Sequence, residues 1–580
     1  MCAWNKRWTR ALSVLMTVGL GCQTHEYNAE VSLTFGKIPR GVSDPCSEQG
    51  EDSSVFKSEL DAVRLRVSGP GMKTMEKTFS SVDEIMMDKV PAGPNRNVLV
   101  SGLSNSATTW RGQVRGLTVE TGKVTEAALL LTKVADLTCT RTSMPEGRAF
   151  ATATQLNDGR ILVTGGISAD SAATDCAQGA VCRSLVATNT ADVLDPTTGE
   201  FTPVGNMSSP RAFHTAAKLK DGRVVIIGGA SLAKVDTSQP LPLVISPNAP
   251  ISSIEIFNPS TNEFENYGSD PAGARTFAAG ITLSDGRVLF SGGGEPNLWT
   301  DTGSGLILKG RNSSVICDSE GCFEGPTMAM RRFGHVMAQL DDGSVMVYGG
   351  SIETGTVRGN DDNGVARDVS RQAPEFFQDD QFFFDANRPS YIDGTGRDNN
   401  LFFGSAMRVK GFGLMIVGGI LREDDSDQPN FTEPDEQAWY VEESVRFVSP
   451  GTDPGTCGDK NGVPRDDCTF KLEIPRFMAQ AVPLQDGRRW VVGGGFSSRS
   501  GFQPSGALEF FPTSKGDVVF EQLTVGGVGR TMRQPRGGVT GVPMVAGTAL
   551  FVGGSTTTDT GSRVSLSTAE IFTDSKEPAP

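Results

Sequence analysis

The feature that most constrains this chain of 580 residues is a short plan that recurs seven times between residues 148 and 554. A repeat has an apolar run, a turn, a second apolar run and a pair of glycines, as in RAFHTAAKLKDGRVVIIGG at residues 211–229. The first glycines of successive repeats are 57 to 75 residues apart, which is too long a period for paired helices and fits one small antiparallel sheet with insertions. The glycine pairs are Gly165-Gly166, Gly228-Gly229, Gly292-Gly293, Gly349-Gly350, Gly418-Gly419, Gly493-Gly494 and Gly553-Gly554.

Asp-Gly turns indicate that each repeat begins with a β-hairpin. Asp-Gly follows the first apolar run in five repeats, for example at Asp158 and Asp221. Glycine reaches the positive φ of a tight turn without steric cost, so Asp-Gly between apolar runs is a strong hairpin signal. A third strand follows the glycine pair, as in ADVLD from Ala191 and SIEIF from Ser253. We therefore predict an all-β fold in which residues 135–574 form a seven-bladed β-propeller, with residues 135–141 supplying the outer strand of the last blade.

A basic residue stands 17 positions before the first glycine in six repeats, and Leu401 takes its place in the fifth. These residues are Arg148, Arg211, Arg275, Arg332, Arg476 and Arg536. They could line the channel mouth and bind an anionic sugar or carboxylate, which makes them candidate binding-face residues. Alternatively, each could fork onto backbone carbonyls or onto a third-strand carboxylate such as Asp192, Glu255 or Glu570. Repetition favours this structural role, because a ligand site rarely needs seven-fold sameness.

The order of strand, Asp-Gly turn, strand, Gly-Gly and Asp/Asn-Pro turn resembles the kelch repeat over about residues 136–574. Where that family has its usual third-strand tyrosine, this chain has Leu194, Phe257 or Phe572. The resemblance implies a kelch propeller, a fold that also carries sugar oxidases of the galactose-oxidase type, which hold copper through tyrosines and histidines. This chain has three histidines, and His214 and His335 share one repeat position, as packing residues do. We expect no catalytic residues, no metal and no cofactor.

The first 22 residues have the pattern of a signal peptide. A basic start and a short apolar run at residues 11–20 are followed by Gly21-Cys22, an ending that resembles a bacterial lipobox and makes Cys22 the expected lipid attachment site. Ordinary cleavage with a soluble product is the alternative. We expect an outer-membrane or cell-surface lipoprotein, or else a periplasmic or secreted protein, that contacts the membrane only through its lipid.

Residues 27–134 alternate apolar and polar side chains, for example at Val63, Leu65 and Val67, which is the period of half-buried strands. About a hundred such residues predict a small β-sandwich. The segment VPAGPNRNVLVSG and the strand that follows it resemble the transthyretin-like or immunoglobulin-like modules of bacterial surface lipoproteins. Residues 575–580 are left as a tail.

Eight cysteines remain after Cys2 and Cys22 are set aside. In an oxidising compartment they predict disulfides, six of them as close pairs and two by elimination. The expected pairs are Cys176 with Cys182, Cys317 with Cys322, Cys457 with Cys468, and Cys46 with Cys139. Zinc is the alternative, but no CxxC spacing and no histidine accompany them.

The net charge and the positions of the insertions narrow the range of expected partners. The formal net charge of −15 disfavours nucleic acid, which needs a basic face. Long insertions follow the glycine pairs at residues 167–187, 230–250, 351–389 and 420–436, all on one face, which makes that face the expected binding surface. The third contains Phe382 and Phe383, which either complete a blade or form a contact patch. The acidic run at residues 421–437 either is a solvated loop or holds calcium.

We therefore expect a monomeric, non-catalytic binding or scaffold protein of the cell envelope, whose propeller face and long loops are presented to a protein or carbohydrate. The alternative is a carbohydrate-active enzyme of the kelch-propeller type, a sugar oxidase or epimerase-like protein without a copper site. A deep axial pocket with clustered carboxylates and arginines would favour the enzyme.

Overall fold

The structure is a computed structural model that is all-β apart from short turns. It describes residues 29–35, 59–80, 85–172, 182–236, 245–297, 307–340, 342–350, 353–354, 374–384, 403–409, 413–422, 439–441, 444–448, 470–484, 489–497, 503–512, 521–522, 524–525, 528–529, 531–558 and 563–577. Over these ranges, no helix has both the length and the apolar character needed to span a bilayer.

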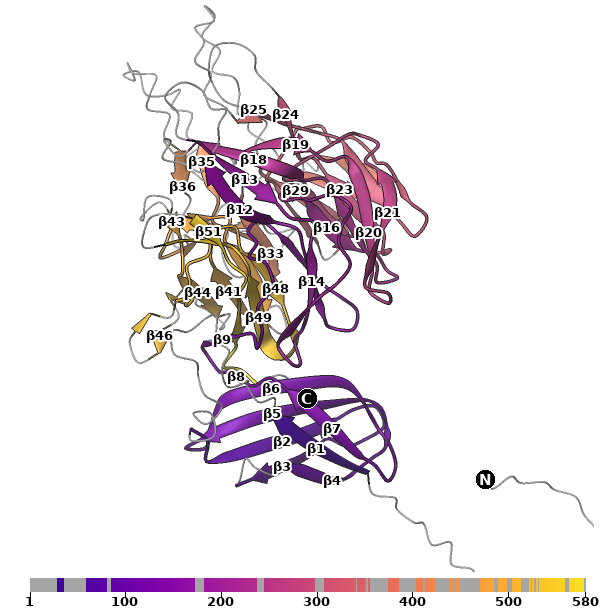
Figure 1. The fold of residues 1–580 in the computed structure, drawn as a ribbon, viewed down its shortest axis with the longest axis vertical. Helices are drawn as coiled ribbons and strands as arrows, with labels where there is room; N and C mark the ends of the chain where they lie inside the picture. Colours follow the sequence, from indigo (N-terminus) through magenta and orange to yellow (C-terminus); the bar gives the residue numbers. More distant parts are fainter. Residues whose placement is uncertain are drawn as a thin grey trace, which may run out of the picture.

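Two sheets face each other in the N-terminal part of the chain (Figure 1). One has five strands in the order β3-β2-β5-β6-β8 and the other three in the order β4-β1-β7. β1 pairs antiparallel with β4 and parallel with β7. The strands are β1 Ala29–Phe35, β2 Ala62–Ser68, β3 Met75–Phe79, β4 Met86–Val90, β5 Gly93–Ser104, β6 Ala107–Val119, β7 Val124–Leu129 and β8 Thr132–Lys133.

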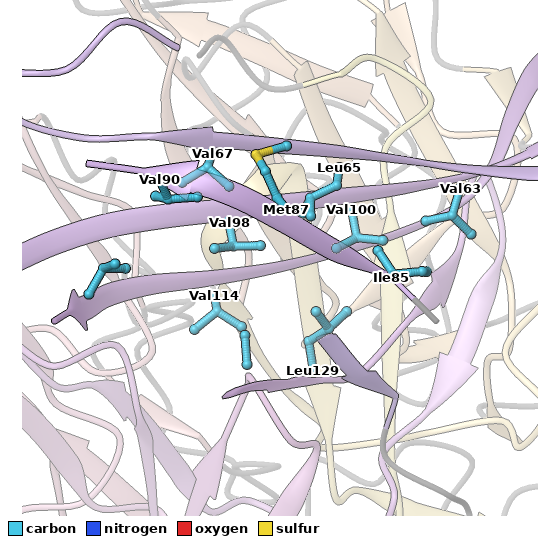
Figure 2. Close-up of a cluster of buried hydrophobic side chains, with 12 residues drawn as sticks. Val63, Leu65, Val67, Ile85, Met87, Val90, Val98, Val100, Val114 and Leu129 are labelled. Carbon is cyan, nitrogen blue, oxygen red and sulfur yellow. The ribbon is translucent and has the colours of Figure 1, made fainter. Parts of the chain in front are cut away.

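The core of this sandwich follows from the alternation along its strands. Successive side chains of a strand point to opposite faces, so Val63, Leu65 and Val67 of β2 all face inward and are fully buried. They pack in one cluster with Met87 of β4 and Leu129 of β7, which belong to the opposite sheet (Figure 2). The alternate residues of β2 face away from this core.

Each of the seven repeats forms a four-stranded antiparallel sheet within the described residues. In chain order, these repeat sheets are β10-β11-β14-β15, β16-β17-β20-β21, β22-β23-β26-β27, β28-β29-β31-β32, β33-β34-β37-β38, β40-β41-β44-β45 and β48-β49-β52-β9. The strands of repeats one to four are β10 Thr152–Gln155, β11 Ile161–Thr164, β14 Ala191–Asp195, β15 Glu200–Pro203, β16 Thr215–Lys218, β17 Val224–Ile227, β20 Ser253–Asn258, β21 Glu263–Ser269, β22 Ala279–Thr282, β23 Val288–Ser291, β26 Ser314–Cys317, β27 Cys322–Glu324, β28 Val336–Gln339, β29 Val345–Tyr348, β31 Glu375–Gln378 and β32 Gln381–Phe383.

Repeats five to seven continue the pattern. Their strands are β33 Ser405–Val409, β34 Gly413–Val417, β37 Ser444–Val448, β38 Phe470–Lys471, β40 Gln480–Leu484, β41 Arg489–Gly493, β44 Leu508–Pro512, β45 Glu521–Gln522, β48 Thr540–Pro543, β49 Thr548–Val552, β52 Ala569–Thr573 and β9 Leu137–Cys139. A single turn of 3-10 helix, η3 Val545–Gly547, joins β48 to β49. The short hairpin β46 Thr524–Val525 and β47 Val528–Gly529 precedes the last repeat.

The repeat sheets stand side by side in chain order. The first strands contact one another as β10 with β16, β16 with β22, β22 with β28, β28 with β33, β33 with β40, β40 with β48, and β48 with β10. The fourth strand of the last sheet is β9, which comes from before the first repeat and pairs Leu137 with Phe572 and Thr138 with Ile571. The chain segment expected to join the two ends therefore pairs as the sequence suggested.

The glycine pair of the sixth repeat is one residue later than expected. The sequence has three consecutive glycines there, and Gly493 ends β41 as an ordinary strand residue. Gly494 and Gly495, with φ of 68° and 88°, take the positive-φ conformation that the glycine pair has in the other repeats. Because β41 is one residue longer, the spacing from Arg476 is 18 rather than 17.

A second layer of short strands follows the glycine pairs, and we call it the hairpin tier. Its strands are β12 Ile167–Ala172, β13 Cys182–Ala187, β18 Ala230–Asp236, β19 Ile245–Pro250, β24 Gly294–Asn297, β25 Ile307–Gly310, β30 Glu353–Thr354, β35 Ile420–Arg422, β36 Trp439–Val441, β42 Phe496–Ser497, β43 Gln503–Pro504, β50 Ser555–Thr557 and β51 Arg563–Ser565. Neighbouring hairpins touch, as β19 with β24, β43 with β50, and β51 with β12. The tier lies on the side of the repeat sheets away from the sandwich (Figure 1).

The hairpin tier corrects two expectations about the insertions. Hairpins follow the glycine pairs of repeats three, six and seven as well, although the sequence showed long insertions only in the other four. The insertion expected at residues 351–389 also contains β31 and β32, which are the third and fourth strands of the fourth repeat. A short apolar strand without a turn signal next to it cannot be told apart, from the sequence, from the insertion that precedes it.

Candidate binding face

The six repeated arginines are buried, and the most exposed of them are only 1 % accessible. Each forms an ion pair with a carboxylate: Arg148 with Asp192 at 2.5 Å, Arg211 with Glu255 at 2.6 Å, Arg275 with Asp270 at 2.5 Å, Arg332 with Glu375 at 3.0 Å, Arg536 with Glu570 at 3.0 Å, and Arg476 with Glu509. The structural role expected for Asp192, Glu255 and Glu570 is therefore confirmed. Buried guanidinium groups with these partners are not available to a ligand at an open face.

Arg211 shows how the guanidinium closes a repeat. Nη1 donates to the carbonyl of Gly228 at 3.0 Å and of Ser253 at 3.1 Å, and Nη2 donates to Ser253 Oγ at 3.0 Å and to Glu255 Oε1 at 2.6 Å. It therefore ties the end of the second strand to the start of the third. Burial lowers the pKa of Arg211, and Glu255 opposes this shift, as expected for a charge that has lost its water.

The third and fifth repeats depart from this pattern. In the third, the carboxylate comes from Asp270, five residues before the arginine, because Val315 occupies the position opposite Phe290 where the acid stands elsewhere. In the fifth, Leu401 stands in place of the arginine, and Arg446 stands opposite Ile416 in place of the acid. The fifth repeat therefore differs from the others at both positions of the arginine–carboxylate pair. Leu401 itself lies outside the described residues.

The glycine pair connects six of the seven repeats to the next, a role that the sequence analysis missed. In these six, the second glycine donates its amide hydrogen to the carbonyl of the next repeat's arginine, and the last repeat donates back to the first. These bonds are Gly166 to Arg211 at 2.9 Å, Gly229 to Arg275 at 2.8 Å, Gly293 to Arg332 at 2.8 Å, Gly419 to Arg476 at 3.0 Å, Gly495 to Arg536 at 2.8 Å and Gly554 to Arg148 at 2.8 Å. At Gly165, the first glycine of its pair, a Cβ would lie 2.2 Å from the carbonyl oxygen of Arg211, so a side chain there would prevent this close approach.

His214 and His335 are packing residues, as their shared repeat position indicated. Nε2 of His214 lies 3.0 Å from Thr152 Oγ1 and 2.9 Å from Thr164 Oγ1, and Nε2 of His335 lies 2.8 Å from Ser291 Oγ. Burial, with the nearby arginines, lowers the pKa of each histidine to about 3. Both rings are therefore neutral at physiological pH.

Acid is expected to destabilise the protein through these histidines. An unfolded histidine takes up a proton below its ordinary pKa of 6.5, whereas the folded one stays neutral down to about 3, so stability falls as the pH drops through this window. At pH 5 the loss is about 2 kcal/mol for each histidine. Urea unfolding at pH 7 and pH 5 should show a smaller acid loss for His214→Gln than for wild type. An equal loss in both proteins would contradict the burial of a neutral ring.

Two residues after each arginine position, the backbone turns into the left-handed region. The residue there is Phe150, Phe213, Phe277, Phe403 or Met478 in five repeats, with φ between 52° and 58°. Left-handed backbone is costly for a large side chain and persists only where the surroundings impose it. In the two remaining repeats the position is taken by Gly334 and Gly538.

Backbone hydrogen bonds link most of these residues from one repeat to the next. In six of the seven repeats, the amide of this residue donates to the carbonyl of its equivalent in the preceding repeat, and the bond from the first repeat goes to the last. The bonds are Phe150 to Gly538 at 2.8 Å, Phe213 to Phe150 at 3.3 Å, Phe277 to Phe213 at 3.0 Å, Gly334 to Phe277 at 3.0 Å, Phe403 to Gly334 at 2.8 Å and Met478 to Phe403 at 2.8 Å. These bonds accompany the left-handed backbone at the same positions.

The side chains of these residues form an apolar layer, which we call the aromatic floor: Phe150, Phe213, Phe277, Phe403, Met478 and the adjacent Phe496. Ring centroids are 4.9 Å apart for Phe150 and Phe213, 4.8 Å for Phe213 and Phe277, and 5.1 Å for Phe277 and Phe403. The layer packs against the bases of the hairpins through Ile167 and Ala187. Phe150, Phe277, Phe403 and Met478 are only partly buried, so part of their apolar surface remains accessible. Phenylalanine at the second position after the arginine was the available signal.

Charged groups from the hairpin tier adjoin the aromatic floor. The guanidinium of Arg563 lies 5.3 Å from the ring centre of Phe496, a cation–π contact, and the pKa of Arg563 is lowered by burial while Asp170 opposes the shift. Asp170 also accepts a hydrogen bond from Arg183 Nε at 2.7 Å. The face thus combines an apolar centre with a few oriented charges.

Phe382 and Phe383 lie in β32 and serve the blade. Phe377 and Phe382 have ring centroids 5.1 Å apart, and Phe376 and Phe383 are 5.9 Å apart, with the first member of each pair buried in β31. These aromatic residues therefore complete the sheet of the fourth repeat, which was one of the two alternatives. Phe384, which follows them, is 48 % exposed.

One expected disulfide, between Cys317 and Cys322, is confirmed and joins β26 to β27. Cys139 is also disulfide-bonded, and its expected partner Cys46 lies outside the described residues. Each of the other two expected pairs has at least one cysteine outside the described residues. Cys22 and most of the acidic run at 421–437 also lie outside them. Among the residues with described positions, no group of three or more His, Cys, Asp or Glu side chains is placed to hold a metal ion.

No protein-family model and no curated protein matches the sequence. Among solved structures, the chain is similar to one described as a novel fungal alcohol oxidase with catalytic diversity among the AA5 family, in complex with copper. The two share 15 % sequence identity with a TM-score of 0.44, over 76 % of this chain and 78 % of that chain. A likeness at this level carries no inference about activity.

Proposed function

We propose that the protein is a non-catalytic binding or scaffold protein of the cell envelope. In this proposal residues 135–574 are a seven-bladed kelch-like propeller closed by β9, preceded at residues 27–134 by a transthyretin-like or immunoglobulin-like sandwich. Residues 1–22 direct export, and a lipid on Cys22 anchors the chain to the outer membrane or cell surface. The monomeric propeller presents the hairpin tier and the aromatic floor to a protein or carbohydrate.

The observation that carries the proposal is the partly accessible aromatic floor beneath the hairpin tier. Apolar side chains held in a left-handed backbone mark a site where the fold maintains an unfavourable arrangement. Exposed apolar surface within a polar rim is typical of a contact site for another molecule. Val186 of β13 and Val564 of β51 add exposed apolar surface on the tier, at 39 % and 42 % accessibility.

The same observation weighs against the enzyme alternative. A sugar-transforming site of the kind considered from the sequence needs charged groups converging at the axis, and its candidate arginines are bonded inside the repeat sheets. In the described part of the chain, the residues that link neighbouring repeats beneath the hairpins are mainly phenylalanines. A binding role therefore has the stronger support.

The proposal predicts that partner capture depends on the hairpin tier. Val186→Glu and Val564→Glu place charges on the tier and should each weaken capture from envelope extracts, or of purified envelope polysaccharide, by about tenfold. The matched control is Phe323→Glu, because Phe323 is 53 % exposed on the outer strand β27. Equal loss with the control variant, or no loss with either tier variant, would contradict the proposal.

A further inference from the structure

The residues that follow β52 lie against the sandwich, although the sequence left them as a tail. The guanidinium of Arg111 in β6 donates to three successive carbonyls of this segment: Nη1 to Asp574 at 2.8 Å and Lys576 at 2.9 Å, and Nη2 to Ser575 at 3.3 Å. Arg111 is 1 % exposed. A buried guanidinium that donates to the backbone carbonyls of one segment recognises the course of its backbone rather than its side chains.

The carboxylate of Glu577 occupies a basic patch on the outer face of the five-stranded sheet. It lies 2.6 Å from Arg64 Nη2 and 3.5 Å from Arg66 Nη2, and it accepts a hydrogen bond from Ser101 Oγ at 2.8 Å. Alternation along β2 sets up this patch, because its valines and leucine face the core and its two arginines face outward. The sheet thus presents positive charge where the acidic segment runs.

The other end of the segment is held by the repeat sheets. The carboxylate of Asp574 lies 2.5 Å from Arg489 Nη1 of β41, and the amide of Asp574 donates to the carbonyl of Gly547 at 2.9 Å. Burial raises the pKa of Asp574, and Arg489 opposes the shift. Residues 574–577 therefore span from the sixth and seventh repeat sheets to the sandwich and contact charged groups of the sixth repeat and of the sandwich.

Two hydrogen bonds show on which side of the repeat sheets the sandwich lies. Gly547 belongs to the turn between β48 and β49, and the amide of Leu130 donates to Thr197, in the turn between β14 and β15, at 2.6 Å. Such turns lie at the ends of the strands opposite the glycine pairs, since each second strand runs from its turn to its glycines. The sandwich is therefore attached to the face opposite the hairpin tier, as Figure 1 also shows.

We propose that residues 574–577 are an intramolecular latch, whose binding to Arg64, Arg66 and Arg111 fixes the sandwich to the turn-bearing side of the repeat sheets. The latch holds the hairpin tier directed away from the sandwich. This inference does not depend on the identity of any partner. It assigns the outer face of the five-stranded sheet a specific occupant, the acidic segment of the same chain.

Substitution of Glu577 tests the latch in the full chain. Glu577→Gln keeps the shape of the side chain and removes its charge, so amide hydrogen exchange at residues 575–577 should accelerate about tenfold. Small-angle X-ray scattering should show a larger radius of gyration as the sandwich becomes free to move. The matched control is Glu76→Gln, because Glu76 pairs with Nε of the same Arg66 at 2.9 Å but lies outside the segment.

A charge swap separates the direct contact from general loosening. Arg64→Glu combined with Glu577→Arg rebuilds an ion pair with reversed polarity and should restore slow exchange and the compact scattering profile. Wild-type behaviour of Glu577→Gln, equal loosening in Glu76→Gln, or no recovery in the swap would each overturn the latch. Partner capture is a separate readout, so loss of the latch and failure of the binding proposal remain distinguishable.

Discussion

Arg211→Ala is expected to lower the free energy of unfolding by about 3–5 kcal/mol. The substitution leaves Glu255 as a buried carboxylate, 2 % exposed, without the guanidinium that lies 2.6 Å from it. It also leaves the carbonyls of Gly228 and Ser253 without the donor that ties the second strand to the third. A loss of this size is a large part of the stability of an ordinary domain.

Arg223→Ala is the matched control, because Arg223 lies in the same repeat but on its surface. It pairs with Asp221 at 2.7 Å, with side chains 26 % and 40 % exposed, and exposed pairs contribute less than about 1 kcal/mol. Urea unfolding of the two variants should differ by at least about 2 kcal/mol. Similar midpoints would show that the buried arginine is not the structural centre of its repeat.

Gly165→Ala is expected to cost about 2–5 kcal/mol of unfolding free energy. Gly165 has φ of 57°, and a Cβ there would lie 2.2 Å from the carbonyl oxygen of Arg211 in the next repeat. That carbonyl also accepts the Gly166 amide at 2.9 Å, so a methyl group would force neighbouring repeats apart and strain this bond. The cost combines left-handed backbone with a contact that has no room to relax.

Gly159→Ala isolates the backbone cost. Gly159 lies in the Asp-Gly turn of the same repeat with φ of 92°, and a Cβ there meets nothing within 4 Å. Its loss should be limited to the 1–2 kcal/mol or so of a left-handed alanine. Chemical unfolding of both variants measures the difference, and equal losses would mean that Gly165 does not mediate contact between repeats.

The repeat sheets could be predicted from local sequence patterns. Apolar runs such as residues 224–227 are fully buried second strands, and the Asp-Gly turns have the positive φ expected of them. The arginine pairs were also predictable, because an acid recurs at a fixed place in the third strand. In each case the signal and the contact belong to the same repeat.

Contacts between repeats were not predictable in the same way. From the sequence, the glycine pair only marked where insertions begin. The structure shows that the amide of the second glycine binds the carbonyl of Arg211, or of its equivalent, in the next repeat. The left-handed phenylalanines depend on hydrogen bonds to residues about 60 positions away, which no local pattern encodes. Asp270 replaces a third-strand acid from a loop, so its spacing gave no sign of the pair.

The attachment of residues 574–577 to the sandwich could not be predicted from the sequence. Arg64 and Arg66 were visible as outward-facing residues of a half-buried strand, yet their partner Glu577 is more than 500 residues away. Charge complementarity between distant segments has no spacing by which to recognise it. The three-dimensional path of the chain supplied what the sequence could not.

The central claim, that the hairpin tier is the binding face, is tested most directly by site-specific photo-crosslinking in envelope extracts. A photoreactive residue at position 564 lies on the tier, and one at position 323 lies on the outer strand of the third repeat. The account predicts a defined adduct from position 564 and none from position 323. Adducts formed from position 323, with none from position 564, would contradict it.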